Sequence, residues 1–236
     1  MEKDSLGNRM KTFYEDRYRI SLTRKTPVII RLDGKAFHTL TRSLPKPFSS
    51  LFMKAMVHAA VQTTKEMQGF KLGYVQSDEV SFCLTDFDTV ETEAWFDYNI
   101  NKLISITAST MSIHFCRVLS TTNGVFDGRA FNIPLEDVPN YFIWRHRDWI
   151  RNSLAMYCKS FFSAKQLHGK NREEQHELLF SIGKNWARDL TWREKNGTFI
   201  FPKGNVSDGL FMLEQAITYP LIESWIKISP FWGLQQ

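Results

Sequence analysis

At 236 residues the chain can hold one large domain or two small ones, and its 43% hydrophobic and 23% charged residues are typical of a soluble globular protein. The net charge of +5 and the pI near 9.1 lean moderately towards a polyanionic partner. Three widely spaced cysteines with no CxxC pair give no support to a zinc ribbon or a disulfide framework. With neither an apolar signal region nor a membrane-length apolar run, we expect a cytoplasmic protein with no membrane partner.

The first quarter of the chain predicts a helix, a strand and a second helix. Residues 1–26 are polar, but apolar side chains recur at helical spacing, which favours a short N-terminal helix docked on the body. Residues 27–33 are apolar and β-branched and form a strand that stops at Asp33-Gly34. After the break at 45–47, a serine can cap a helix that runs to about Met67.

The next elements complete a recognisable order. Residues 71–76 and 79–85 read as strands joined in a hairpin with Ser77-Asp78 at its tip. A helix is predicted from about Glu91 to Arg117, with acidic residues in its first turn. Residues 129–133 give a fourth strand. The order is the ferredoxin-like split βαβ arrangement, βαββαβ, in the α+β class.

The last part of the chain differs in pattern. Helices are predicted at 140–162 and 172–180, and an Asn-Gly pair between strand-like runs at 190–194 and 198–201 predicts a hairpin. No linker-like stretch separates this part. We therefore expect a first domain at 1–134 and a helical and hairpin appendage at 135–236 packed on it; the apolar tail from 207 has no assigned role.

Two acidic tips are the candidate catalytic centre. Asp33 and Asp78 end neighbouring strands, so the fold order puts them side by side. Close carboxylates repel each other unless a cation lies between them, and Mg²⁺ typically uses one or two carboxylates plus water and phosphates. Alone, each tip is more simply an ordinary turn. Together they favour a two-metal nucleotidyl-transfer site, with the Gly34 carbonyl as a further ligand.

Basic residues offer weaker candidates. Lys46 lies between two prolines and is suited either to clamping a triphosphate or to an ordinary solvated loop. His38, taken alone, is more simply a surface histidine. Arg147 and Arg151 share a helix face that can follow phosphates, although a solvated basic face is the default interpretation.

Several stretches resemble the tRNA-histidine guanylyltransferases and their guanylyltransferase-like relatives. Residues 31–38 resemble the metal-binding strand end of that family, and residues 76–82 resemble its second carboxylate motif. The similarity continues through Asp148 and Asn152 to about residue 204, and its other segments are 4–11, 126–129, 141–145 and 177–180.

The resemblance implies a palm-like domain, related to that of polymerases, that adds nucleotides to the 5′ end of tRNA. In the family, the 3′-hydroxyl of the incoming nucleoside triphosphate attacks a 5′-phosphate activated by ATP or GTP. By position, the resemblance implies that the catalytic residues are Asp33, Asp78 and Glu79, of which Glu79 supports the site and does not bind metal. Two Mg²⁺ ions would be bound by Asp33, Gly34 and Asp78. The nucleotide would be bound by Gly34, Lys35, His38, Lys46 and Ser77, and the RNA by Arg129, Arg145, Arg147, Arg151 and Asn152. It also implies a homo-tetramer.

Two departures from the family pattern narrow the expectation. Relatives that add guanosine to tRNA-histidine carry a His-Ile-Asn-Asn motif, whereas here Ile150 stands in place of the histidine. This indicates the relatives that repair 5′-truncated tRNA in a template-directed 3′–5′ reaction. Ser49 stands where relatives often have aspartate, which leaves the base preference open. The alternatives are a dedicated tRNA-histidine guanylyltransferase, a relative that binds RNA without catalysis, and a nucleotide cyclase.

Overall fold

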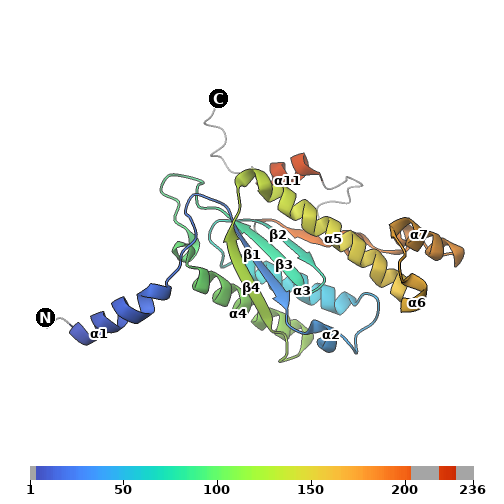
Figure 1. The fold of residues 1–236 in the computed structure, drawn as a ribbon, viewed down its shortest axis with the longest axis horizontal. Coiled ribbons are helices and arrows are strands. Elements are labelled where there is room, and N and C mark those ends of the chain that lie inside the picture. Colours follow the sequence, from blue (N-terminus) through green and yellow to red (C-terminus); the bar gives the residue numbers. More distant parts are fainter. Residues whose placement is uncertain (1–3, 203–217, 227–236) are drawn as a thin grey trace.

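A five-stranded antiparallel sheet forms the centre of the protein (Figure 1). The computed structural model describes residues 4–202 and 218–226. The spatial strand order is β4-β1-β3-β2-β5. The strands are β1 (Val28–Gly34), β2 (Phe70–Gln76), β3 (Glu79–Leu84), β4 (Phe126–Asn132) and β5 (Thr198–Ile200).

Helices cover both faces of this sheet. One face packs on α3 (Ser50–Thr64) and α4 (Ile100–Leu119), and the other packs on α5 (Val138–Lys159). Strand alternation explains the division, because Val28, Ile30 and Leu32 point into the first layer while Ile29 points into the second. The shorter helical elements are α1 (Ser5–Met10), η1 (Lys11–Glu15), η2 (Asp16–Tyr18), α2 (Phe37–Leu40), η3 (Trp95–Tyr98), η4 (Leu135–Asp137), α6 (Ala164–Leu167), α7 (Arg172–Ser181), α8 (Trp186–Asp189), α9 (Trp192–Asn196) and α11 (Tyr219–Ile226).

The second half of α5 connects the sheet to the small helices. Its side chains Leu154, Tyr157 and Cys158 form a separate small core with Leu179 of α7. Its first half covers β2 and β3 through Val138 and neighbouring residues. One helix therefore belongs to both parts of the molecule. No helix among residues 4–202 and 218–226 combines the length and apolarity needed to cross a membrane.

The α+β class and the βαββαβ order of residues 28–132 are confirmed, but the hairpin predicted at 190–201 is wrong. Thr191 begins helix α9 with a capping box: its hydroxyl accepts from the Glu194 amide, and the Glu194 carboxylate accepts from the Thr191 amide at 2.8 Å. Gly197, at φ 69°, ends the helix. β5 then pairs with β2 as a fifth strand. The Asn-Gly pair is thus a helix terminus rather than a hairpin turn.

The predicted start of the helix that precedes the fourth strand is also wrong. Helix α4 begins at Ile100, not near Glu91, because the Asn99 side chain accepts a hydrogen bond from the Lys102 amide. The preceding loop is held by Asp86, whose carboxylate accepts from Arg24 at 2.6 Å and from the Lys25 amide at 2.8 Å. The acidic residues at 91 and 93 therefore lie in a loop.

The N-terminal segment begins as a helix, but its helical elements α1 and η1 do not dock on the body; the segment joins the body only from Tyr18 onwards. It projects away from the sheet in Figure 1. Leu6 is 61% exposed, Phe13 is 53% exposed and Tyr18 is 75% exposed. The apolar spacing that predicted a helix was correct, whereas the expected packing of that helix on its own chain was not. The tail from residue 207 lies outside the described residues except for 218–226.

Candidate active site

The structure brings the two acidic tips together at one edge of the sheet. In the strand register, Asp33 stands opposite Glu79 on one side and opposite Asp127 on the other. The amide of Gly34 donates a hydrogen bond to the carbonyl oxygen of Asp78 at 3.0 Å. This bond fastens the tip of the β2–β3 hairpin to the end of β1. The predicted pairing of the two strand ends follows directly from the antiparallel register.

Negative charge accumulates around Asp33. Burial raises the pKa of its carboxyl group, and the carboxylates of Asp78, Glu79 and Asp127 raise it further. Arg31 lowers the pKa, but its effect is the smallest of these. The ionised form of Asp33 is therefore less favourable in the folded protein than in the unfolded chain. A cation between the tips would remove the penalty.

Glu79 differs from the two aspartates because its carboxylate is enclosed by arginines. It is 6% exposed, and both of its oxygens accept from Arg145, at 2.7 and 2.8 Å. The Arg31 guanidinium lies 3.2 Å from the same group, and the Gln76 amide donates to it at 3.1 Å. With both oxygens engaged by arginines, Glu79 fits a positioning role, and its support of the site without metal ligation stays a prediction.

The donor set suits a hard divalent cation. In the described ranges, no group of three or more His, Cys, Asp or Glu side chains is arranged to enclose a metal ion. An all-protein cage of the kind that structural zinc uses is therefore not present in that part of the chain. Mg²⁺ needs less, because it binds through one or two carboxylates and completes its shell with water and substrate phosphates. Asp33 and Asp78 offer that pair.

Two neighbouring cavities open at the acidic edge. The first, of about 340 Å³, is lined by both aspartates and by one face of α5. The second, of about 250 Å³, is lined by aromatic and apolar side chains of α2, α3 and the segment between them. The residues common to both are Gln76, Ser77, Asp78, Trp149 and Met156. The hairpin tip therefore forms the wall between a charged space and an apolar one.

Three of the predicted nucleotide-binding residues meet in the apolar cavity. His38, Lys46 and Ser77 line it, and the two basic side chains are solvent-exposed. Lys35 is exposed but lines neither cavity, and its amide donates to the Val125 carbonyl oxygen at 2.9 Å. Gly34 is buried beneath the tip against Phe37.

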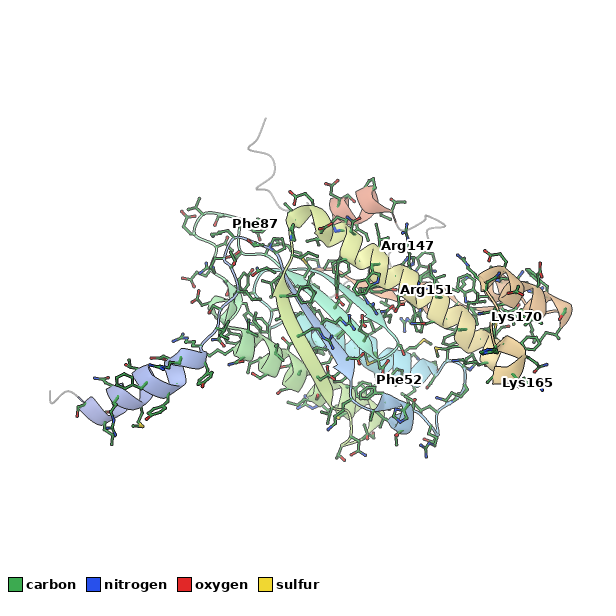
Figure 2. All side chains as sticks on the ribbon, in the orientation of Figure 1. Phe52, Phe87, Arg147, Arg151, Lys165 and Lys170 are labelled. Carbon is green, nitrogen blue, oxygen red and sulfur yellow. The ribbon has the colours of Figure 1, made fainter. Side chains whose placement is uncertain are left out.

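The predicted RNA-binding residues separate into two groups. Arg129, Arg147, Arg151 and Asn152 are exposed, and Figure 2 shows Arg147 and Arg151 following each other along α5. Arg145 is only 6% exposed and its guanidinium is engaged by Glu79 and Asp148. The difference has a simple cause, because Arg145 lies on the side of α5 that faces the sheet whereas Arg147 and Arg151 lie on the side that faces solvent.

Further residues that were not among the predicted site residues line the cavities. Asp148, Trp149 and Lys159 line the charged cavity, and their spacing on one helix was the signal that could have found them. Arg193 lines the apolar cavity, and burial lowers the pKa of its guanidinium. Because its segment read as a strand, no sequence signal placed Arg193 there.

The chain is similar in sequence to known proteins. The family model for Thg1, tRNAHis guanylyltransferase, matches residues 7–134. The chain belongs to this family. Its relatives include a probable tRNA(His) guanylyltransferase of Drosophila melanogaster, 28% identical over 246 aligned residues that cover 94% of this chain and 81% of the relative. The family is one of nucleotidyltransferases.

Solved structures agree over nearly the whole chain. A bacterial tRNA(His) guanylyltransferase (Thg1)-like protein in complex with ATP has a TM-score of 0.87 and 34% identity, covering 95% of this chain and 100% of that one. A bacterial Thg1-like protein in complex with GTP has a TM-score of 0.77 and 31% identity over the same shares. The α+β architecture is therefore shared with members of this family that bind nucleotides.

Proposed function

We propose that this protein adds nucleotides to the 5′ end of tRNA in the 3′–5′ direction and thereby repairs 5′-truncated tRNA. The observation that carries the proposal is the pairing of Asp33 and Asp78, fastened by the Gly34–Asp78 hydrogen bond, beside a cavity suited to a nucleotide. The sheet with its acidic edge would then act as a polymerase-like palm.

Asp33 and Asp78 would hold Mg²⁺ at the sheet edge, together with the Gly34 carbonyl. When bound, two such ions supply activation of the attacking 3′-hydroxyl and stabilisation of the leaving pyrophosphate. The protein keeps the two aspartates in place through the register of β1 with β3. Glu79 contributes from behind, because its fixed carboxylate holds the hairpin to α5 through Arg145.

The apolar cavity is the proposed site for ATP or GTP as activating nucleotide. Pockets for nucleotides combine apolar walls with a few polar groups that fix orientation. Phe48 and Phe52 supply such walls, while Lys46 and Ser77 would contact the phosphates and His38 would lie beside the base. The relatives solved with ATP and GTP support this assignment.

We propose tRNA repair in preference to maturation of tRNA-histidine because of one residue of α5, Ile150. Ile150 is half-buried at the position where the resemblance expects the histidine of the guanosine-adding relatives. An apolar side chain there cannot donate a hydrogen bond or carry charge. Template pairing, rather than a protein contact, would then select the added base. The exposed Arg129, Arg147, Arg151 and Asn152 would contact the tRNA backbone.

We also propose that the chain assembles as a tetramer. The N-terminal segment exposes a row of large apolar side chains, which are Leu6, Met10, Phe13, Tyr14, Tyr18 and Ile20. Such a row is costly in water and is covered most simply by other copies of the chain. Light scattering should give the mass of four chains, and a Phe13→Ser, Tyr18→Ser variant should give a lower mass. An unchanged mass would remove this segment from the interface.

The activity is tested with a labelled tRNA that lacks its first nucleotide. With Mg²⁺, ATP and all four nucleoside triphosphates, the wild type should extend the 5′ end with the nucleotide that the opposite strand specifies. Asp78→Ala should abolish the extension, whereas the control Glu91→Gln, an exposed substitution in the loop before α4, should keep full activity. Guanosine addition to full-length tRNA-histidine without a template would instead support the dedicated guanylyltransferase. Binding without turnover would support a non-catalytic relative, and cyclic product from GTP alone would support a cyclase.

A further inference from the structure

One face of α5 forms the far wall of the charged cavity. The lining residues recur every three or four positions, so they lie in a stripe along the helix, and they are Arg145, Asp148, Asn152, Ala155, Met156 and Lys159. At a rise of about 1.5 Å per residue the stripe is roughly 21 Å long from its first to its last member. It begins beside Glu79 inside the protein and ends at the surface.

The charged side chains at the start of this stripe are ion-paired, whereas the one at its end is not paired with any described residue. Arg145 is engaged by Glu79 and Asp148, and Asp148 also accepts from Arg151 at 2.7 Å and from Asn152 at 3.3 Å. Lys159 is exposed and has no hydrogen-bond or ion-pair partner among residues 4–202 and 218–226. The stripe therefore ends in an ammonium group that no carboxylate of the described residues neutralises.

Four carboxylates line this cavity, and arginines pair with two of them, Glu79 and Asp148. The other two, Asp33 and Asp78, lie at one end and the Lys159 ammonium lies at the other. This arrangement suits a ligand that binds cations and is itself anionic. A phosphate group meets both conditions, since its oxygens accept from the ammonium and also coordinate a divalent ion. Asn152, between the two ends, can contribute an amide donor. The simpler explanation is that a lysine in the last turn only complements the helix dipole, which is worth a few tenths of a kcal/mol to about 1 kcal/mol.

The position of Lys159 favours RNA over the nucleotide as the source of that phosphate. Lys159 lines the charged cavity but not the apolar one that we assign to the activating nucleotide. Beyond Lys159 the basic residues continue: Lys165 and Arg172 are exposed and lack partners in the described ranges. Figure 2 shows Lys165 and Lys170 just past the end of α5, on the side away from the sheet. An RNA strand that reaches the cavity past the end of α5 would carry its phosphates close to these basic residues.

We propose that Lys159, assisted by Asn152, holds the 5′-terminal phosphate of the acceptor RNA at the mouth of the charged cavity. This inference rests on the proposed function, because it assigns the RNA end to the same site. Lys159 acts here as a binding residue for the substrate phosphate. Lys165 and Arg172 would contact the internucleotide phosphates that follow.

The test measures binding and requires no turnover. A tRNA-like hairpin with a 5′-phosphate and the same hairpin with a 5′-hydroxyl are titrated against the protein with magnesium chloride and no triphosphate. The wild type should prefer the phosphorylated end, and Lys159→Met should lose roughly tenfold on that RNA alone, the effect of one charge-assisted hydrogen bond. Lys65→Met is the matched control, because Lys65 caps the end of α3 and is exposed outside both cavities.

The outcomes separate the two claims. Equal affinity of wild type for both RNA ends, or an equal loss on both ends in Lys159→Met, would overturn the assignment of Lys159 to the terminal phosphate. A weaker affinity of Lys159→Met for ATP, with RNA binding unchanged, would assign the lysine to the nucleotide and also overturn it. Lys159→Arg keeps the positive charge and should keep part of the preference for the phosphorylated end. This variant tests the role of the charge if Lys159→Met does not fold. A wild type that shows the preference but adds no nucleotide would contradict the proposed function and leave the phosphate site standing.

Discussion

Arg145 of α5 and Glu79 of β3 form a buried bidentate ion pair, with nitrogen–oxygen distances of 2.7 and 2.8 Å. Each residue is 6% exposed. The pair joins the helix that lines the charged cavity to the strand that follows the hairpin tip. Any disturbance of it is therefore expected to reach Asp78, the residue directly before Glu79.

Removal of one partner should destabilise the protein strongly. Arg145→Met leaves a buried carboxylate with less compensation, and we expect a loss of about 3–5 kcal/mol in the free energy of unfolding. Arg151→Met is the matched control: it breaks an ion pair to Asp148 from an exposed position and should cost less than about 1 kcal/mol. Urea denaturation measures both. The double variant Glu79→Gln, Arg145→Met should recover part of the loss, and similar values for the two arginines would contradict the account.

The raised pKa of Asp33 predicts a pH-dependent penalty. Because its pKa is higher in the folded than in the unfolded chain, the folded state binds more protons and stability falls as pH rises from the ordinary value of 3.8 through the folded value. Asp33→Asn should therefore melt at a higher temperature than the wild type at pH 7 without divalent ions. Melting curves at pH 4 and pH 7 would show the difference shrinking at low pH.

The same carboxylate predicts a metal effect. If Mg²⁺ binds the folded pair of aspartates, as we propose, it should raise the melting temperature of the wild type at pH 7. It should raise that of Asp33→Asn much less. An equal rise in the two proteins would place the ion elsewhere.

Gly34 is expected to tolerate no side chain. A Cβ at this position would lie 2.5 Å from the ring of Phe37, which packs in a cluster with Phe52, Phe115 and Phe126. Gly34→Ala should cost about 1–3 kcal/mol and reduce nucleotide addition, because the ring and the strand end must shift. Phe37→Leu in the same chain should relieve part of both effects. Full additivity of the two substitutions in the free energy of unfolding would argue against the clash.

Thiol reactivity provides a check on the core. Cys83 is fully buried, and burial raises the pKa of its thiol to about 12. Cys158 is also buried, whereas Cys116 is half-buried. An alkylating reagent should therefore modify Cys116 first in the native protein and all three cysteines in denaturant. Early modification of Cys83 in native conditions would contradict the sheet packing.

The sequence predicted the parts of the fold that depend on local pattern. The strand ends at Asp33 and Asp78 were found because an apolar run that stops at polar turn residues is a strong local signal. Their proximity followed from strand order. The Asn196-Gly197 pair led to a wrong hairpin prediction, because the capping box at Thr191 begins a helix that ends at Gly197.

Other features depended on tertiary context. Arg145 and Arg147 are equivalent in sequence terms, and only the direction in which α5 faces the sheet separates the buried ion pair from the exposed cation. Arg193 reaches the apolar cavity because β5 joins the sheet beside β2, a long-range pairing that no local pattern encodes. The exposure of the N-terminal segment could not be predicted either, because hydrophobic periodicity predicts an apolar helix face but not the surface against which that face packs.

The measurement that tests the central claim most directly is the rate of 5′ extension of truncated tRNA by wild type, Asp78→Asn and Asp33→Asn at saturating Mg²⁺. If the two aspartates share the ions, each substitution should lower the rate by at least about a hundredfold, while both proteins remain folded and bind tRNA. Extension at near wild-type rate by either variant would contradict the account.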